Sequence, residues 1–245
     1  MNNTRGVNDT SNAREAILGR IRGALRDVPR EEQPEQVLVE RDYLHEDSAS
    51  RDEIIERFIE RVTDYKAKVQ RVEEQDLSAF TTFACYQRGI RSLIVPTDMP
   101  QEWLPVNVTL LRDTETAPLT REQIERSDGV LTGCALGIAQ TGTIVLDSGT
   151  RQGRRILSLL PDYALCLIWE DQITGLVPEA ITRLNEPREA GTGSQKRPLT
   201  FISGPSATSD IELKRVEGVH GPRTLEVFVV HPATPELNAD RENSI

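Results

Sequence analysis

Apolar positions recur along the chain with two spacings, one typical of helices and the other of buried strands. Apolar residues three and four apart predict amphipathic helices, and short continuous apolar runs predict strands covered on both faces. The predicted helices cover residues 13–26, 51–65, 77–88, 120–126 and 175–184. The predicted strands cover residues 67–72, 91–95, 108–111, 163–169, 199–202 and 225–230, with two more inside 129–147. Because helices and strands alternate, we predict an α/β fold with a mainly parallel sheet flanked by helices.

The stretch Gly129–Asp147 combines apolar runs with an unusual density of small residues. We expect a short strand, a small-residue loop and a second strand. Two interpretations of the loop stay open. The glycines either serve close packing, or free backbone N–H groups beside the Thr141 and Thr143 hydroxyls bind an anion or an acyl group. The stretch has neither the Gly-Lys-Ser/Thr of a phosphate-binding P-loop nor the Gly-x-Gly-x-x-Gly of a dinucleotide site.

A second concentration of polar residues follows the predicted strand 199–202. The segment Ser203–Glu212 holds hydroxyl groups, one glycine and two acids. Ligands of α/β proteins usually bind beyond the carboxyl ends of the strands, so this segment is a candidate binding loop. His220 follows in the turn Gly218–Pro222, where it is either a structural hydrogen-bonding residue or a general base or metal ligand.

Three arginines, Arg151, Arg154 and Arg155, form the most basic spot in an acidic chain. Guanidinium groups bind carboxylates and phosphates with two parallel hydrogen bonds. The cluster is therefore either an anion clamp or part of a solvated loop.

Composition excludes several classes of function. The formal net charge of −10 disfavours nucleic acid and anionic membranes as partners, because both need clustered Lys and Arg. Three widely spaced cysteines do not form an iron–sulfur or zinc motif, and we expect no metal or cofactor bound by this chain. The absence of an apolar leader or membrane span predicts a cytoplasmic protein.

We divide the chain into three parts. Residues 1–49 form a polar tail, an N-terminal helical arm and a linker, residues 50–231 the α/β domain, and residues 232–245 a polar C-terminal tail. The N-terminal arm either packs on its own domain or clasps a partner subunit.

Four motifs occur in one order along the chain, at Gly137–Leu146, Ser158–Pro161, Ser203–Glu212 and Gly218–Pro222. Together they resemble the lactate-utilisation protein C family, whose shared unit is called the LUD domain. The resemblance covers roughly residues 50–231. It implies a fold similar to that of the NagB, ribose-5-phosphate isomerase and CoA-transferase group.

The resemblance also implies a function. Members of the family are bacterial cytoplasmic proteins encoded with two iron–sulfur proteins, and the three together oxidise L-lactate to pyruvate. This chain would be the component without clusters, and its partners would be the iron–sulfur subunits. Many members have an acid where this chain has Gln140, and a glutamine cannot act as a general base or as a covalent carboxylate.

These observations lead to one expected site. We expect the two loops to face each other at the carboxyl edge of the sheet and to bind a small carboxylate or the anionic part of a cofactor. His220 and either Asp210 or Glu212 would be the catalytic, proton-handling pair. The expected ligand-binding residues come from the two loops and the arginine cluster: Gly137, Gln140, Thr141, Gly142, Thr143, Arg151, Arg154, Arg155, Ser203, Gly204, Ser206 and Thr208.

Two other functions remain open at this point. One is a stand-alone protein that binds a small ligand or has a regulatory role, without catalysis. The other is an acyl- or CoA-transferase-like enzyme, which rests on analogy of fold alone.

Overall fold

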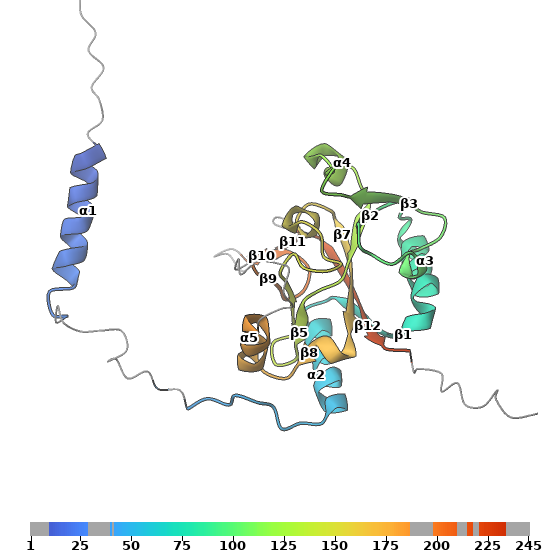
Figure 1. Ribbon diagram of the computed structural model, residues 1–245, viewed down its shortest axis with the longest axis horizontal. Helices are drawn as coiled ribbons and strands as arrows, with labels where there is room; N and C mark the ends of the chain where they lie inside the picture. The colour runs from blue at the N-terminus through green and yellow to red at the C-terminus, as the bar shows by residue number, and fades with distance from the viewer. Residues whose placement is uncertain are drawn as a thin grey trace, which may run out of the picture. The chain divides into compact units, whose positions relative to one another are not determined.

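The computed structural model describes residues 10–28, 40, 42–186, 198–209, 215–217 and 221–233 (Figure 1). Contacts between Cα atoms divide the chain into two units, Met1–Tyr43 and Leu44–Ile245. The first unit contains helix α1, Thr10–Ala24, close to the predicted 13–26. The apolar side chains of Ile17 and Ile21 on this helix are exposed.

A six-stranded sheet is the centre of the second unit, and all its neighbouring strands run parallel. The strand order is β1-β12-β7-β4-β2-β3. The strands that come first and last along the chain, β1 and β12, are therefore neighbours in the sheet (Figure 1). This confirms the predicted α/β class. The strands are β1 Lys68–Glu73, β2 Ser92–Pro96, β3 Thr109–Asp113, β4 Gly129–Thr132, β7 Tyr163–Trp169 and β12 Thr224–His231.

Each face of this sheet has its own hydrophobic core. Along β12, Val227 and Val229 belong to one core, whereas Phe228 and Val230 belong to the other, as the two-residue period of a strand requires. The helices are α2 Arg51–Asp64, α3 Leu77–Arg88, α4 Arg121–Glu125 and α5 Val177–Asn185. The first core packs against α2 and the second against α3. Among the helices described, none is both long and apolar enough to cross a membrane.

Short 3₁₀ turns connect several of these elements. They are η2 Glu74–Asp76, η3 Gln101–Trp103, η4 Arg155–Ser158 and η5 Glu170–Gln172.

Local capping explains where α2 begins. The Ser50 hydroxyl accepts a hydrogen bond from the Glu53 backbone N–H, and the Glu53 carboxylate accepts one from the Ser50 N–H. Helix α3 ends at Gly89, which adopts a left-handed conformation with φ of 67°.

A second, four-stranded sheet in the order β8-β5-β6-β9 lies beside the large one. Its strands are β5 Leu136–Ile138, β6 Thr143–Leu146, β8 Ile173–Thr174 and β9 Thr200–Ile202. The stretch 129–147 thus contains three strands where we predicted two, and β8 was not predicted. The polar segment after β9 also contains strand β10, Ala207–Ser209, paired with β11, Arg215–Glu217.

Gly137 explains why β5 resembles a loop in the sequence. A Cβ atom at this position would lie 2.6 Å from Ile168 Cδ1 and 2.8 Å from Phe58 Cε2. The small residue is therefore needed where β5 packs against the large sheet and α2. A strand built from small residues for close packing has the same composition as a turn.

Gly142 and Gly204 bring two further backbone segments against the end of α2. Both have positive φ, 58° and 92°. A Cβ on Gly142 would lie 2.7 Å from the carbonyl carbon of Arg61, and one on Gly204 would lie 2.6 Å from Tyr65 Cβ. The two loops singled out in the sequence are therefore both held at the C-terminal turn of α2.

We predict that Gly142→Ala destabilises the protein more than Gly89→Ala. Both glycines have positive φ, but no atom lies within 4 Å of a Cβ built on Gly89. Gly89→Ala should therefore cost only the strain of a left-handed residue, about 1 kcal/mol, and Gly142→Ala about 2–3 kcal/mol. Urea unfolding of the two variants measures the difference. Equal losses of unfolding free energy would contradict the close approach to Arg61.

Candidate functional site

The two loops predicted to form a site do meet. Thr143, the first residue of β6, has its Oγ1 atom 2.7 Å from Oγ of Ser203, which follows β9. The Thr141 hydroxyl extends this chain, with its Oγ1 atom 2.8 Å from that of Thr143. Antiparallel pairing of β6 with β9 places the two segments side by side.

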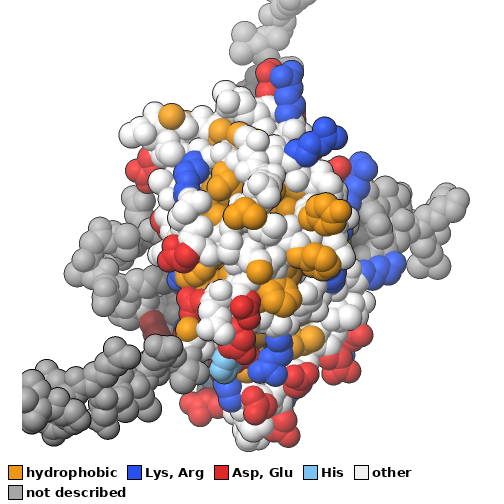
Figure 2. All heavy atoms as spheres, turned by 90° about the vertical axis from the view of Figure 1, so that its right-hand side faces the viewer, with side chains coloured by type: hydrophobic (Ala, Val, Ile, Leu, Met, Phe, Trp, Pro, Cys, Tyr) orange, Lys and Arg blue, Asp and Glu red, His pale blue; other side chains and the backbone are white. Residues whose placement is uncertain are grey.

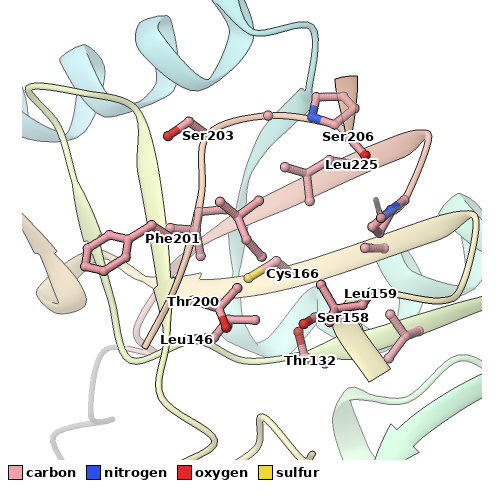
Figure 3. Close-up of a pocket in the computed structure, with 18 residues that line it drawn as sticks. Thr132, Leu146, Ser158, Leu159, Cys166, Thr200, Phe201, Ser203, Ser206 and Leu225 are labelled. Atoms are coloured by element: carbon pink, nitrogen blue, oxygen red, sulfur yellow. The ribbon is translucent and has the colours of Figure 1, made fainter. Parts of the chain in front are cut away.

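A cavity of about 220 Å³ lies next to this contact (Figure 3). It is bounded by strands of both sheets, by η4 and by the segments 203–206 and 221–222. The lining residues from the large sheet are Val130, Thr132, Ala164, Cys166 and Leu225, and those from the small sheet include Ile144, Leu146, Thr200, Phe201 and Ile202. Ala164 and Leu225 are the second residues of β7 and β12, Cys166 is in the middle of β7, and Thr132 is the last residue of β4. The cavity therefore lies over the sheet face. It reaches the carboxyl end of β4, as we expected, but not the carboxyl ends of β7 and β12.

Hydroxyl groups and one thiol supply the polar chemistry of the cavity. Figure 3 shows Ser203 and Ser206 on one side of it and Thr132 and Ser158 on the opposite side, with the sulfur of Cys166 between them. None of the lining residues that the structure describes carries a charge. Such a cavity suits a small ligand whose polar atoms form hydrogen bonds and whose remaining atoms contact aliphatic walls.

The residues of the glycine-rich turn lie apart from this cavity. Gln140 is near the start of α5, where its Oε1 atom accepts a hydrogen bond of 3.4 Å from the Val177 backbone N–H. Its own backbone N–H donates to the Gly175 carbonyl. Gln140 therefore holds the β5–β6 turn against the beginning of α5.

The three arginines also lie outside the cavity lining. Arg151 has its guanidinium carbon 5.1 Å from the centre of the Trp103 ring and 4.8 Å from that of Trp169, a cation–π contact with both. Arg155 is exposed at the start of η4. In the part of the chain that the structure describes, these three arginines do not form an anion clamp around the cavity.

Arg154 forms an ion pair with Asp113 through two nitrogens, at 2.8 and 2.6 Å, and also donates to the Leu119 carbonyl. Burial alone would raise the pKa of the Asp113 carboxyl. The hydrogen bonds from Arg154 and the Leu119 backbone outweigh burial and lower this pKa. The contact attaches the arginine loop to the end of β3.

The predicted catalytic residues Asp210, Glu212 and His220 lie outside the described residues, so their roles stay predictions. Thr208 is part of β10, but the position of its side chain is not described. Gly221, the residue after His220, lines the cavity.

Sequence analysis did not name the lining residues Thr132, Ser158 and Cys166 as ligand-binding, although Ser158 begins one of the four motifs. All three are buried, and each has a polar or polarisable side chain within or next to an apolar run. A polar residue that interrupts an apolar run was the sequence signal available for a lining position. It does not distinguish a lining residue from a hydrogen-bonded core residue, because both positions are inaccessible to solvent.

A second polar cluster lies at the carboxyl edge of the large sheet. His231 Nδ1 is 2.8 Å from Glu170 Oε2, and Arg71 donates from Nη2 and Nε to Glu170 Oε1 at 2.6 and 3.1 Å. Burial would raise the pKa of Glu170, but the hydrogen bonds from His231 and Arg71 lower it overall. The hydrogen bond to Glu170 raises the pKa of His231. Within the described parts of the chain, no group of three potential metal ligands occurs.

Comparison with known proteins assigns the family. A family model described as the LUD domain matches residues 55–230. The chain therefore belongs to the LUD-domain family, as the four motifs indicated.

The individual relatives are consistent with this. Over 181 residues the chain is 46% identical to Lactate utilization protein C of Deinococcus radiodurans, an alignment covering 74% of this chain and 81% of the relative. It is 28% identical over 180 residues to the protein of the same name in Shouchella clausii, covering 71% of this chain and 77% of that relative. The crystal structure of a DUF162 family protein from Deinococcus radiodurans superposes with a TM-score of 0.61 at 39% identity. It covers 74% of this chain and 99% of that chain.

We predict that Arg154→Gln lowers the unfolding free energy by about 1–2 kcal/mol, a value that allows for the half-exposed arginine. The substitution leaves the Asp113 carboxylate, whose side chain is 3% exposed, without its cation. Arg155→Gln is the matched control and should change stability by less than about 0.5 kcal/mol. Urea unfolding measures both, and an Arg154→Gln variant as stable as the wild type would contradict a structural role for this arginine.

We predict a pH-dependent contribution from His231 and Glu170. The stabilisation from His231, whose pKa is raised, is lost as pH rises through its folded-state pKa, and that from Glu170, whose pKa is lowered, is lost as pH falls through its folded-state value. The pair is therefore most effective between the ordinary pKa values of 4.5 and 6.5.

Wild type should have a larger unfolding free energy than His231→Gln, and this difference should be greater at about pH 5.5 than at about pH 8.5. Thr182→Ala on α5, which removes no titratable group, is the control. A difference that stays constant between the two pH values would show that the histidine does not interact with Glu170 as a cation.

Proposed function

We propose that this protein is the cytoplasmic, non-iron–sulfur component of a bacterial system that oxidises L-lactate to pyruvate, and that it binds a small carboxylate in the cavity beside Thr143 and Ser203. The observation that carries the proposal is the meeting of the two family motifs at a hydroxyl-lined cavity. The names of the relatives, Lactate utilization protein C, supply the metabolic context.

The cavity supports a ligand of this class for two reasons. Its hydroxyl groups can donate hydrogen bonds to carboxylate oxygens, and its aliphatic walls suit a short carbon chain. Because the described lining residues carry no charge, the hydroxyls would have to compensate the ligand's lost hydration. We therefore expect weak, millimolar-range binding of lactate or pyruvate to the isolated chain, roughly 4 kcal/mol.

The cysteines support a division of labour with iron–sulfur partners. Cys85, Cys134 and Cys166 are all buried and free. Burial raises the pKa of Cys85 to about 11 and that of Cys134 well above its ordinary value. Thiolates are the ligands of iron–sulfur clusters, and the side chains of Cys85 and Cys134 favour the thiol form. In this proposal the clusters belong to the partner proteins.

Binding experiments with two variants test the cavity. Cys166→Leu fills space in its wall and Ser203→Ala removes a hydroxyl group, so each should weaken lactate or pyruvate binding by about tenfold. Thr182→Ala is the control, because its hydroxyl lies on α5 and donates to the Pro178 carbonyl. Ligand-observed NMR measures binding, and thermal unfolding confirms that the variants are folded.

Genetics and co-purification test the wider role. Deletion of the gene should abolish growth on L-lactate, and Cys166→Leu should rescue growth less well than Thr182→Ala. If the proposal is correct, the full chain should co-purify with iron–sulfur proteins from lactate-grown cells. Normal growth of the deletion strain would overturn the role in lactate oxidation. Turnover of an acyl-CoA by the isolated chain would favour a transferase, and ligand binding without iron–sulfur partners would favour a stand-alone binding protein.

A further inference from the structure

The outer face of α3 is unusual for a helix on the surface of an acidic chain. Of its twelve residues, Arg88 alone is charged, and its Nε atom donates to the buried Glu226 carboxylate at 3.0 Å. Two aromatic side chains on the helix are strongly exposed, Phe83 at 52% and Tyr86 at 82%. Solvent-facing helix surfaces normally carry charged residues, so this face is an exception that calls for a physical reason.

Helix α2 of the same unit shows the ordinary pattern. It buries Ile54, Ile55, Phe58 and Val62. Its remaining positions are mostly charged: Arg51, Asp52, Glu53, Glu56, Arg57, Glu60, Arg61 and Asp64. The contrast shows that the neutral face of α3 is a local property and does not reflect a general shortage of charged residues.

The apolar surface continues beyond the helix. Val106, between η3 and β3, is 57% exposed. Several partly exposed hydrophobic residues belong to the rim of the core beneath α3: Phe80, Ile90, Val108 and Leu110. Figure 2 shows hydrophobic side chains across the middle of the face on the α3 side, with most charged side chains towards its edges. We call the surface formed by Phe80, Phe83, Tyr86, Ile90, Val106, Val108 and Leu110 the α3 patch.

Net charge restricts which surfaces two copies of the chain can bring together. Each copy of the chain carries a formal charge of −10, so two copies repel each other through most of their surfaces. A neutral, apolar face is where two such molecules can approach with the least repulsion. In a two-fold symmetric dimer the same patch meets itself, and an uncharged apolar patch is complementary to its own copy.

We propose that the α3 patch is the interface of a homodimer in which α3 of one copy packs against α3 of the second copy. The cavity beside Ser203 lies on the α2 side of the large sheet, so this dimer leaves the cavity accessible. A helix of this length is only about 18 Å long, and stable dimers bury roughly 800 Å² per partner. The flanking residues of the patch are therefore needed, and we expect dissociation in the micromolar range.

Analytical ultracentrifugation of the full-length protein, over a concentration range of about 1–200 μM, tests the proposal. Wild type should shift from monomer to dimer within this range. Added salt should strengthen the dimer, because it screens repulsion between the acidic copies. Tyr86→Glu and Phe83→Glu should each raise the dissociation constant at least about tenfold, because they place new carboxylates opposite each other across the two-fold axis.

Ile181→Glu is the matched control, because Ile181 is an apolar residue 40% exposed on α5. It should leave dimerisation unchanged, and thermal unfolding should show that all the variants are folded. Three outcomes would overturn the proposal: a wild type that stays monomeric throughout, a dimer that Tyr86→Glu does not weaken, or a patch variant that loses only the iron–sulfur partners. Ligand binding is measured separately on Tyr86→Glu, so failure of the dimer is distinguishable from failure of the proposed lactate role.

Discussion

The arrangement of the site depends on how closely two loops approach the last turn of α2. At Gly142 and at Gly204 there is no room for a Cβ atom, and the backbone of both residues is left-handed. The loops can reach α2 only because both positions lack a side chain. With both loops held there, Thr143 and Ser203 come within hydrogen-bonding distance. The site is thus positioned by backbone packing, and the hydroxyl contact follows from it.

The same packing explains why a cavity exists. Gly137 lets β5 lie close to Ile168 and Phe58, which closes one part of the space between the two sheets. Strands β6 and β9 cover a part of the large sheet where short side chains such as Ala164 and Cys166 line the cavity. Short side chains on one side and a covering strand pair on the other leave space for a small molecule. Two unequal sheets packed in this way therefore leave a cavity over the face of the parallel sheet.

Local signals in the sequence predicted much of the fold. Helix α3 has the predicted bounds, because its apolar periodicity ends at a glycine suited to the left-handed C-terminal position. Strand β7 also has the predicted bounds, since a continuous apolar run ends beside turn residues. The small sheet was harder to predict. Strand β5 contains a glycine in a three-residue span, and β8 has only two residues, which is too short for any periodicity.

The lining of the candidate cavity was predicted only in part, because it depends on long-range contacts. Ser203, Gly204 and Ser206 line the cavity, as a polar segment after a strand indicated. The arginines illustrate the limit of local reasoning. Arg154 is paired with Asp113, 41 positions earlier in the chain, and Arg151 contacts Trp103 and Trp169. A basic cluster gives no sign of whether such partners exist, because they come from elements that only the folded sheet brings together.

The contacts of Gln140 give this residue a local structural role. Its side chain is directed at a backbone N–H in the first turn of α5, where the helix macrodipole concentrates partial positive charge. A carboxylate would interact with that end through both its charge and its hydrogen bond, whereas the amide keeps the hydrogen bond alone. An acid at this position would therefore change the capping of α5. The position anchors the turn to the helix and lies outside the lining of the cavity.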